Sequence, residues 1–287
     1  MSTAVVTMDR AEAAGARAVR PDPLRDYLAG LAFRLVHPEM PFPDGLLPAF
    51  ALQACARAGL SLDVYNAALP AGDFERRMAL GRLCGMARAS TYCIAAIIDK
   101  AVSLLDEEAA FVNVGVWQGF TFLAGLVGNP DKRCIGIDNF STAAKKDARG
   151  RPAFRGLSKL AYRLNDRVAR RAFYRNFERL RSERHSFCEM DYMEYFQRVH
   201  QGPIGFYIYD AQHRYRDQYR GLELAEPFFS ADCVVLIDDT NAADNRRATY
   251  DFMQHSRYDY EVLLDRRTAG NRHPTFWNGV LVFRRVG

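Results

Sequence analysis

The sequence predicts an α/β fold in which a mostly parallel sheet follows a helical N-terminal region. Two short apolar runs, Ile204–Tyr209 and Cys233–Ile237, each end in a carboxylate, and the helix-forming stretch Tyr215–Glu226 separates them. Strand, helix and strand in this order describe a βαβ unit of a parallel sheet. A similar alternation occupies residues 110–138, whereas residues 24–107 space their apolar side chains at a helical period.

The bulk composition is that of a globular protein with one large domain, or one domain and a helical appendage. The chain has 287 residues, of which 49% are hydrophobic and 25% charged. No run of about 18 apolar residues is present, so no membrane span is expected. Residues 1–22 are rich in Ala and Arg without a signal-peptide core, which predicts a disordered tail. The six cysteines show no paired spacing, which favours buried thiols in a reducing cytoplasm.

Positive charge is concentrated in one segment. Residues 144–185 hold 14 Lys or Arg and four Asp or Glu, although the whole chain carries only +5. The rest of the chain is therefore net negative, and the overall charge is not a nucleic-acid signature.

The N-terminal region, residues 23–107, is expected to be helical. The clearest stretches are Asp26–Val36, Leu46–Ala58 and Asp73–Leu105, the last broken near Gly85 or Ser90. Asp73 is expected to cap its helix, because its carboxylate can accept the free amide hydrogens of the first turn. A lid, a dimer face and plain packing remain alternatives for this region.

The strand Ala110–Val116 opens the second region, residues 108–287. Gly115 lies near the end of this strand and Gly119 in the turn after it, a helix covers Phe120–Val127, and a second strand, Cys134–Ile137, ends on Asp138. A glycine turn lets the backbone approach a ligand, and a terminal acid can accept hydrogen bonds from both ribose hydroxyls. This layout is typical of a nucleotide- or nucleoside-binding half. The G-x-G-x-x-G fingerprint is absent, which disfavours a dinucleotide.

A long helix is expected over Leu157–Arg181, where one apolar stripe includes Phe173 and Phe177. Arginines fill its other face, as on a solvated helix or on a platform for an anionic partner. Further short strands are expected at Ser186–Cys188, Tyr260–Leu264 and Gly279–Phe283.

Four polar residues are expected to share one cleft. Asp210 follows the strand Ile204–Tyr209, and His213 comes three residues later; Asp238 and Asp239 follow the next strand. In open α/β sheets, ligands bind beyond the carboxyl ends of the strands, so these side chains should converge there.

These pieces together resemble class I S-adenosylmethionine-dependent methyltransferases. Among them, the chain from about residue 108 looks most like the magnesium-requiring O-methyltransferases of the macrocin and mycinamicin type, which modify sugars on bacterial natural products. The segments that carry the resemblance are VNVGVWQGFT (112–121), IGIDNF (135–140), CEMD (188–191), YDAQH (209–213) and LIDDTN (236–241). The pairing of D-x-x-H with a later acidic doublet is its most specific part.

The resemblance implies a Rossmann-like sheet of seven strands with an antiparallel last strand. It also implies that the first three segments bind the methionine, ribose and adenine parts of S-adenosylmethionine, and that the last two hold Mg²⁺ and a base. The donor-binding residues would be Asn113, Gly115, Gln118, Gly119, Asp138, Asn139, Met190, Asp191 and Asp210. Asn113 stands where many relatives have an acid, and Asp238 stands where a longer Glu is common.

The residue types suit methyl transfer to an oxygen. Mg²⁺ prefers oxygen ligands, which Asp210, Asp238 and Asp239 would supply. A hydroxyl on the metal loses its proton more readily, and His213, with a pKa expected near neutrality, would accept that proton. The expected acceptor is a hydroxyl of a small molecule such as a natural-product sugar or a phenol.

Two alternatives stay open from the sequence. One is a methyltransferase without metal, in which His213 acts alone or the substrate is an amine. The other is a binding protein whose basic helix, residues 157–181, engages RNA or another anionic partner. Nucleic acid is the less favoured partner, and a homo-oligomer is left open.

Overall fold

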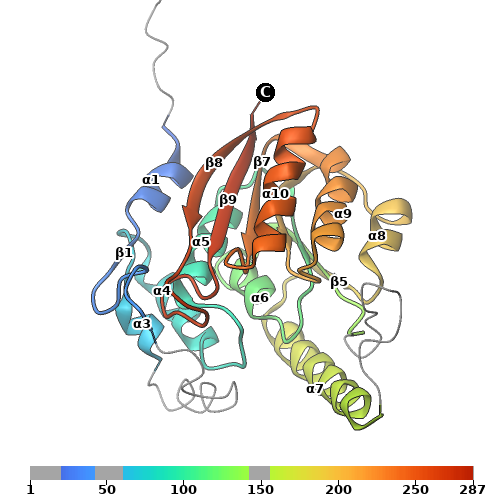
Figure 1. Cartoon of the computed structure of the whole chain (residues 1–287), viewed down its shortest axis with the longest axis horizontal. Coiled ribbons are helices and arrows are strands. Elements are labelled where there is room, and N and C mark those ends of the chain that lie inside the picture. The colour runs from blue at the N-terminus through green and yellow to red at the C-terminus, as the bar shows by residue number, and fades with distance from the viewer. Residues whose placement is uncertain (1–20, 43–60, 142–155, 287) are drawn as a thin grey trace, which may run out of the picture.

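The computed structural model describes residues 21–42, 61–141 and 156–286. Nearly all of the expected tail, residues 1–22, and the expected helix Leu46–Ala58 lie outside these ranges. In the described part of the chain, seven strands form one sheet (Figure 1). They are β3 (Ala110–Val114), β4 (Arg133–Ile137), β5 (His185–Cys188), β6 (Ile204–Tyr209), β7 (Phe229–Asp238), β8 (Asp259–Arg266) and β9 (Val280–Val286).

The strand order is β5-β4-β3-β6-β7-β9-β8. Pairs from β5 to β7 are parallel, and β9 runs antiparallel to both of its neighbours, β7 and β8. The expected mostly parallel sheet with an antiparallel last strand is confirmed. The order reverses between β4 and β6, since β3 lies in the centre, and ligands in open α/β sheets bind at such a switch point.

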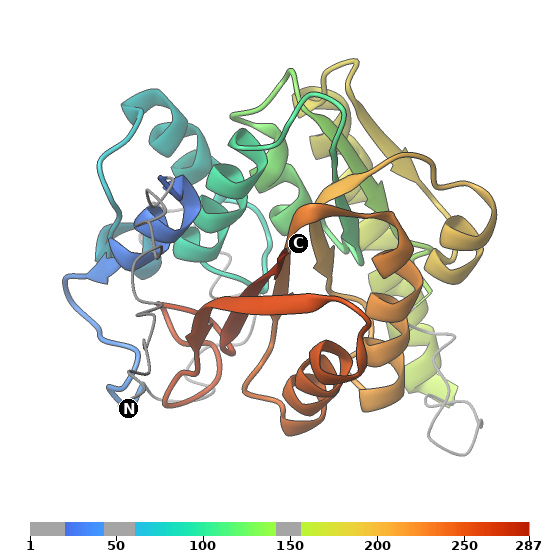
Figure 2. The same ribbon diagram turned by 90° about the horizontal axis from the view of Figure 1, so that it is seen from above.

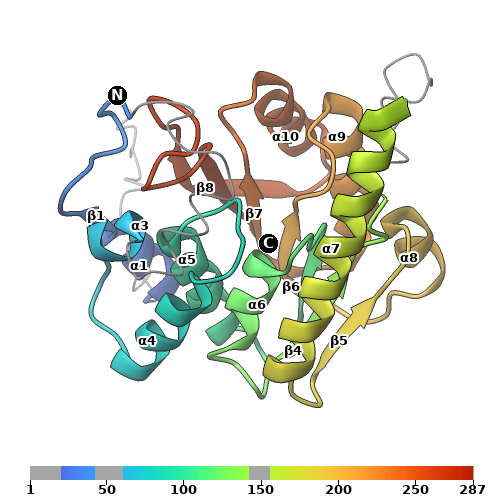
Figure 3. The same ribbon diagram turned by 90° about the horizontal axis from the view of Figure 1, so that it is seen from below.

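Helices cover both faces of the sheet (Figures 2 and 3). On one face lie α5 (Tyr92–Ser103), α6 (Phe120–Leu126) and α7 (Gly156–Leu180). On the other lie α8 (Tyr192–Arg198), α9 (Tyr215–Ala225) and α10 (Ala243–His255), with the 3-10 turn η2 (Glu226–Phe228) after α9.

Alternation along the strands builds one apolar core on each face. On β3, Phe111 belongs to the core under α5 and α6, whereas Val112 and Val114 belong to the core under α8, α9 and α10. On β6, Phe206 and Ile208 likewise alternate with the buried tyrosines of the strand. The period of two places successive side chains on opposite faces, and both faces are buried here, so β6 is apolar or aromatic along its whole length.

The N-terminal region shares the first of these cores. Its elements are α1 (Pro23–Ala29), β1 (Ala32–Phe33), α3 (Leu62–Asn66), β2 (Ala67–Ala68), α4 (Phe74–Leu83) and α5. Asp73 caps α4 as predicted, accepting from the amides of Glu75 and Arg76. The helix expected over Asp26–Val36 is wrong: α1 ends at Ala29, and Ala32–Phe33 pairs instead with β2.

Two ion pairs hold the elements of this region together, and Asn129, in the loop after α6, adds a contact to the second of them. Arg88, in the connection between α4 and α5, binds Asp63 of α3 at 2.7 Å. Arg76 of α4 binds Asp99 of α5 at 2.7 Å, and Asn129 donates to the same carboxylate at 3.0 Å. Both acids are buried, so each pair also satisfies a carboxylate that would otherwise be costly to bury.

Helix α7 agrees closely with the expected helix Leu157–Arg181, but its apolar stripe is buried only in part. Phe173 and Phe177 are in the core, whereas Leu157, Leu160, Leu164 and Val168 are 52–85% exposed. The first half of α7 extends past the edge of the sheet, where no described element covers it (Figure 3). None of the helices in the described residues is long and apolar enough to cross a membrane.

Candidate active site

The turn after β3 is packed so tightly that only glycine fits. Gly115 has a φ of +84°, and a Cβ there would lie 2.2 Å from the carbonyl oxygen of Asp210. Gly119 has a φ of +101°, and a Cβ there would lie 2.9 Å from the ring of Phe173 on α7. The turn therefore presents bare backbone beside the end of β6.

Asp138, at the end of β4, organises the neighbouring turns. One carboxylate oxygen accepts from the backbone amide of Trp117 at 2.9 Å, and the other from that of Phe140 at 2.8 Å. Burial raises the pKa of Asp138, and these amide donors act in the opposite direction. Asn139 follows at the surface, and its amide donates to Asp191 at 3.5 Å.

Residues after β5 occupy the outer part of the same edge. Asp191 caps α8 by accepting from the amide of Met193 at 2.9 Å. Met190 packs against the core on the α8 side of the sheet. Glu189 instead accepts from Arg170 of α7 at 2.8 Å and from the hydroxyl of Tyr174 at 2.8 Å.

Three polar side chains meet beyond β6 and β7. His213 Nε2 lies 3.1 Å from Asp239 Oδ2 and 3.8 Å from Asp210 Oδ1. One ligand atom from each of the three residues lies within 4.8 Å of the others. All three side chains are 25–35% exposed, so a small ligand can reach them.

Asp238 is not part of this group. Its side chain is buried, its Oδ1 accepts from the amide of Asp239 at 2.8 Å, and its Oδ2 accepts from the hydroxyl of Ser90 at 3.4 Å. Burial, and after it the carboxylates of Asp239 and Asp210, raise the pKa of Asp238 well above its ordinary value. Asp238 therefore stabilises the turn after β7 through hydrogen bonds. The group of three possible ligands contains His213 in addition to Asp210 and Asp239, whereas the sequence analysis expected Asp238 there.

Further residues that sequence reasoning missed hold Asp239 in place. The amide of Asn278 donates to Asp239 Oδ1 at 2.7 Å, and the amide of Asn245 donates to the carbonyl of Asp238 at 2.8 Å. Asp239 itself has a φ of +60°, which is strained for a residue with a side chain. Asn278 lies far away in the sequence and shows only as a turn residue there, so no local signal pairs it with Asp239.

Two predicted donor-binding residues differ in their surroundings. Asn113 is fully buried in β3, with its amide 3.5 Å from the carbonyl of Gly115 and its Oδ1 without a hydrogen-bond donor. Gln118 is partly exposed and lines a large cleft between α4 and α7.

The arrangement fits both a nucleoside-type donor and a divalent cation. The glycine turn packs its backbone directly against the end of β6, and Asp138 retains lone pairs on both oxygens after accepting two amides. Mg²⁺ ligands at about 2.0–2.1 Å lie within roughly 4.2 Å of one another. The two measured distances from His213 Nε2 satisfy this limit. The contacts of His213 Nε2 with the two carboxylate oxygens are attractive when Nε2 carries a proton, or when a cation is bound by the nitrogen and the oxygens together.

A seven-stranded sheet with this order, a glycine turn after the central strand and an acid after the next one define the class I methyltransferase fold. Residues 112–240 match a family model described as a methyltransferase domain. This segment contains every predicted site residue, and the chain is an S-adenosylmethionine-dependent methyltransferase.

Solved structures with similar folds include three from bacteria. An O-methyltransferase from Bacillus cereus in complex with SAH shares 11% identity, covering 84% of this chain and 94% of that one, with a TM-score of 0.43. The O-methyltransferase TomG from Streptomyces achromogenes shares 10%, covering 84% and 91%, with a TM-score of 0.43. An rRNA methylase from Streptococcus thermophilus shares 10%, covering 68% and 97%, with a TM-score of 0.43. A search of curated proteins found no match.

Proposed function

We propose that this chain is an O-methyltransferase that uses Mg²⁺ and methylates a hydroxyl of a small molecule, as in the macrocin and mycinamicin type. The observation that carries the proposal is the meeting of Asp210, His213 and Asp239 directly beside the glycine turn. Gly115 packs on the carbonyl of Asp210, so the donor-binding turn and the acidic group form one surface.

The roles of the residues follow from their chemistry. Asp138 would accept hydrogen bonds from the ribose of the donor, and the turn at Gly115 and Gly119 would lie along its methionine part. Asp210 and Asp239 would hold Mg²⁺, which acts as a Lewis acid towards an acceptor hydroxyl. When bound, S-adenosylmethionine supplies a methyl group on a sulfonium centre, from which an oxygen nucleophile displaces the thioether.

His213 would remove the proton of the acceptor. Its Nε2 faces the two carboxylates, and it takes the hydroxyl proton while the oxygen becomes the nucleophile. Asp239, 3.1 Å away, would stabilise the imidazolium that results. Asp238, buried and hydrogen-bonded to Ser90, would fix the turn that aims Asp239. In this scheme the ion need not include His213 among its ligands.

The test combines donor binding, chelation and three variants. Calorimetry with S-adenosylhomocysteine measures donor binding, and methyl transfer is measured on a panel of small-molecule hydroxyls. His213→Ala and Asp239→Asn should each lower methyl transfer by about 10²–10⁴ while they leave donor affinity within about threefold. Asp259→Asn is the matched control, because Asp259 is an exposed acid where β8 begins.

Each part of the proposal fails on a different result. Absence of S-adenosylhomocysteine binding contradicts the donor role of the glycine turn. Full activity after EDTA treatment contradicts the metal role only. Full activity of His213→Ala contradicts the base role and would favour an acceptor that is already a good nucleophile.

A further inference from the structure

A large cleft between α4 and α7 carries unusual charge. It encloses about 1080 Å³ and is lined by residues from the N-terminal region, from the turn after β3 and from α7. Its lining includes four arginines, Arg77, Arg82, Arg175 and Arg179, and no Asp or Glu among the described residues. Such a volume is at the upper end of ligand pockets, and a lining of one sign attracts a ligand of the other sign.

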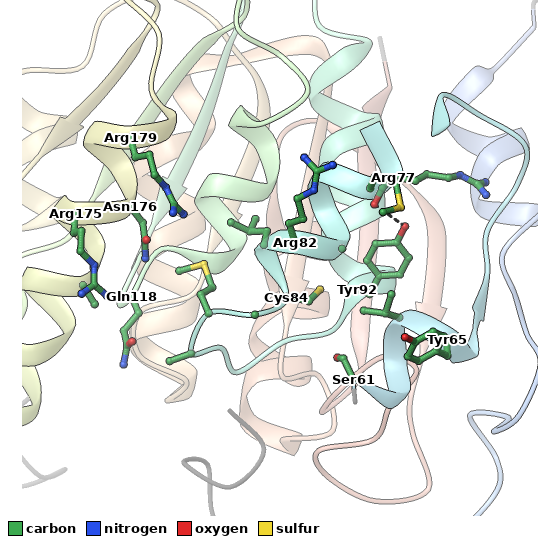
Figure 4. A pocket seen from close by; sticks show the side chains of 18 of the residues that line it. Ser61, Tyr65, Arg77, Arg82, Cys84, Tyr92, Gln118, Arg175, Asn176 and Arg179 are labelled. Atoms are coloured by element: carbon green, nitrogen blue, oxygen red, sulfur yellow. Dashed lines mark hydrogen bonds between the residues drawn. The ribbon is translucent and has the colours of Figure 1, made fainter. Parts of the chain in front are cut away.

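The arginines stand on opposite sides of the cleft. Figure 4 shows Arg175 and Arg179 projecting from α7 on one side, with Arg77 and Arg82 on the side of α4. The guanidinium of Arg77 donates to the carbonyl of Leu69 at 2.9 Å, so one of its nitrogens is already used. The side chains of Arg82, Arg175 and Arg179 are exposed, and their guanidinium groups have no ion pair or hydrogen bond to any described residue.

Neighbouring arginines on the same two helices behave differently. Arg76 of α4 binds Asp99, and Arg170 of α7 binds Glu189. Each of these guanidinium groups therefore has a carboxylate within the fold, whereas those in the cleft have none in the described chain. A guanidinium presents a planar fork of donors that matches phosphate oxygens, so the cleft is suited to a phosphate group.

The cleft adjoins the proposed active site at two places. Gln118 lines it and lies in the same turn as Gly115 and Gly119. Ala87 also lines it, and Ser90, three residues further on, donates to Asp238. Three residues span at most about 11 Å, so one small molecule can extend from the cleft to the edge of the sheet.

Apart from the arginines, the lining combines apolar residues with a few neutral polar ones, among them Ser61, Gln118 and Asn176. The apolar part includes Val168 and Ala172 of α7 and, from the N-terminal region, Leu83 and Met86. A ligand that fits both the arginines and the apolar lining has an anionic group together with an apolar or ring-containing portion. Free RNA would be drawn instead to the exposed outer face of α7, where Arg167 and Arg171 lie outside the cleft.

We propose that this cleft binds a phosphate group carried by the small-molecule methyl acceptor, with Arg82, Arg175 and Arg179 as its ligands. The inference rests on the proposed function, because it assigns the acceptor's phosphate to a cleft that opens beside the donor turn. The acceptor's reacting hydroxyl then lies towards Asp239 while its phosphate stays between α4 and α7.

Calorimetry with inorganic pyrophosphate tests the site without knowledge of the acceptor. Titrations use the full chain at constant ionic strength, with and without saturating S-adenosylhomocysteine. Expected is one site per chain that persists in the presence of S-adenosylhomocysteine. The double variant Arg175→Ala/Arg179→Ala and the single variant Arg82→Ala should each weaken it at least tenfold.

The control is Arg167→Ala/Arg171→Ala, which removes the same charge from the outer face of α7 and should change the affinity less than twofold. Equal losses in both double variants overturn the proposal, because they show only general attraction to a basic helix. Loss of pyrophosphate binding when S-adenosylhomocysteine is present also overturns it, since the anion then occupies the donor site. Binding of a single-stranded RNA 12-mer that depends on Arg167 and Arg171, with no pyrophosphate site, overturns it in favour of RNA.

The outcome is separable from that of the proposed function. Failure of S-adenosylhomocysteine to bind contradicts the methyltransferase assignment of the turn, whatever pyrophosphate does. Pyrophosphate that fails to bind while S-adenosylhomocysteine binds contradicts only the acceptor site. Circular dichroism of each variant confirms that the charge substitutions leave the fold intact.

Discussion

Aspartates follow the carboxyl ends of strands in both halves of the sheet, but they have different partners in the two halves. In the half formed by β3, β4 and β5, Asp138 uses both oxygens on backbone amides, those of Trp117 and Phe140. In the half formed by β6 and β7, Asp210 and Asp239 face an imidazole instead. The carboxylate in the first half thus binds backbone of its own turns, and the carboxylates in the second half lie beside a side chain that can carry a proton.

The difference teaches what an acid at a strand end can do. A carboxylate that accepts two amides shapes the backbone and can still offer its remaining lone pairs to a bound ligand. A carboxylate held beside another and beside an imidazole needs a proton or a cation between them, because like charges repel at short range. The two halves meet where Gly115 packs on the carbonyl of Asp210. The predictions below perturb one half and ask whether the other responds.

The largest effect is expected in the half formed by β6 and β7. Asp239→Asn removes the negative charge beside His213 but keeps the side-chain shape, so methyl transfer should fall by about 10²–10⁴. Thermal stability and S-adenosylhomocysteine affinity should hardly change, because Asn can still accept from Asn278. Steady-state rates with calorimetry measure both quantities, and an equal loss of rate and donor affinity would show that the halves are not independent.

The second-largest effect is expected where the two halves meet, at Gly115. Gly115→Ala places a Cβ on the carbonyl of Asp210 at a φ that favours glycine, so the turn or β6 must shift. The free energy of unfolding should fall by about 2 kcal/mol or more, and donor affinity and activity should fall together. Gly72→Ala is the control, because a Cβ there would have its nearest neighbour at 3.9 Å. An unchanged donor affinity would argue against the turn as the donor site.

The half formed by β3 and β4 should lose stability as well as binding. Asp138→Ala leaves the amides of Trp117 and Phe140 without their acceptors, which should cost about 1–3 kcal/mol in chemical denaturation. S-adenosylhomocysteine affinity should fall at least tenfold, while Mg²⁺ binding by the Asp210–Asp239 pair is retained. Asp138→Asn keeps one acceptor oxygen, so its free energy of unfolding and its S-adenosylhomocysteine affinity should lie between those of the wild type and of Asp138→Ala.

The smallest effect on stability is expected at Glu189, which follows β5 at the edge of the sheet. The hydrogen bond from Arg170 holds the pKa of Glu189 below its ordinary value of 4.5. A lowered pKa means that the stabilisation is present at neutral pH and is lost as the pH falls through the folded-state pKa. Because the pair is exposed, Glu189→Gln should lower the melting temperature by less than about 2 °C at pH 7. Melting curves should converge near pH 3, and a difference that persists there would exclude the ion pair as its cause.

Much of the sheet could be read from the sequence, because its signals are local. The run Ile204–Tyr209 was predicted with the bounds of β6, and the strand ending on Asp138 is β4. The sequence predicts a glycine turn at Gly115 and Gly119, and the structure gives both residues a positive φ, which the sequence alone does not show. The helix over Asp26–Val36 failed because a short strand pairing overrode its local preference.

The amino-acid sequence by itself determined which residues end the strands and that these ends share one edge, because strand period and connection handedness act over short stretches. Only the tertiary structure decided that Asp238 is buried against Ser90 while Asp239 faces His213. Adjacent residues leave a strand end in opposite directions, and the choice depends on packing by segments nearly 150 positions away. The same holds for the cleft, whose arginines on α4 and α7 line one cavity only because two distant helices lie beside the same turn.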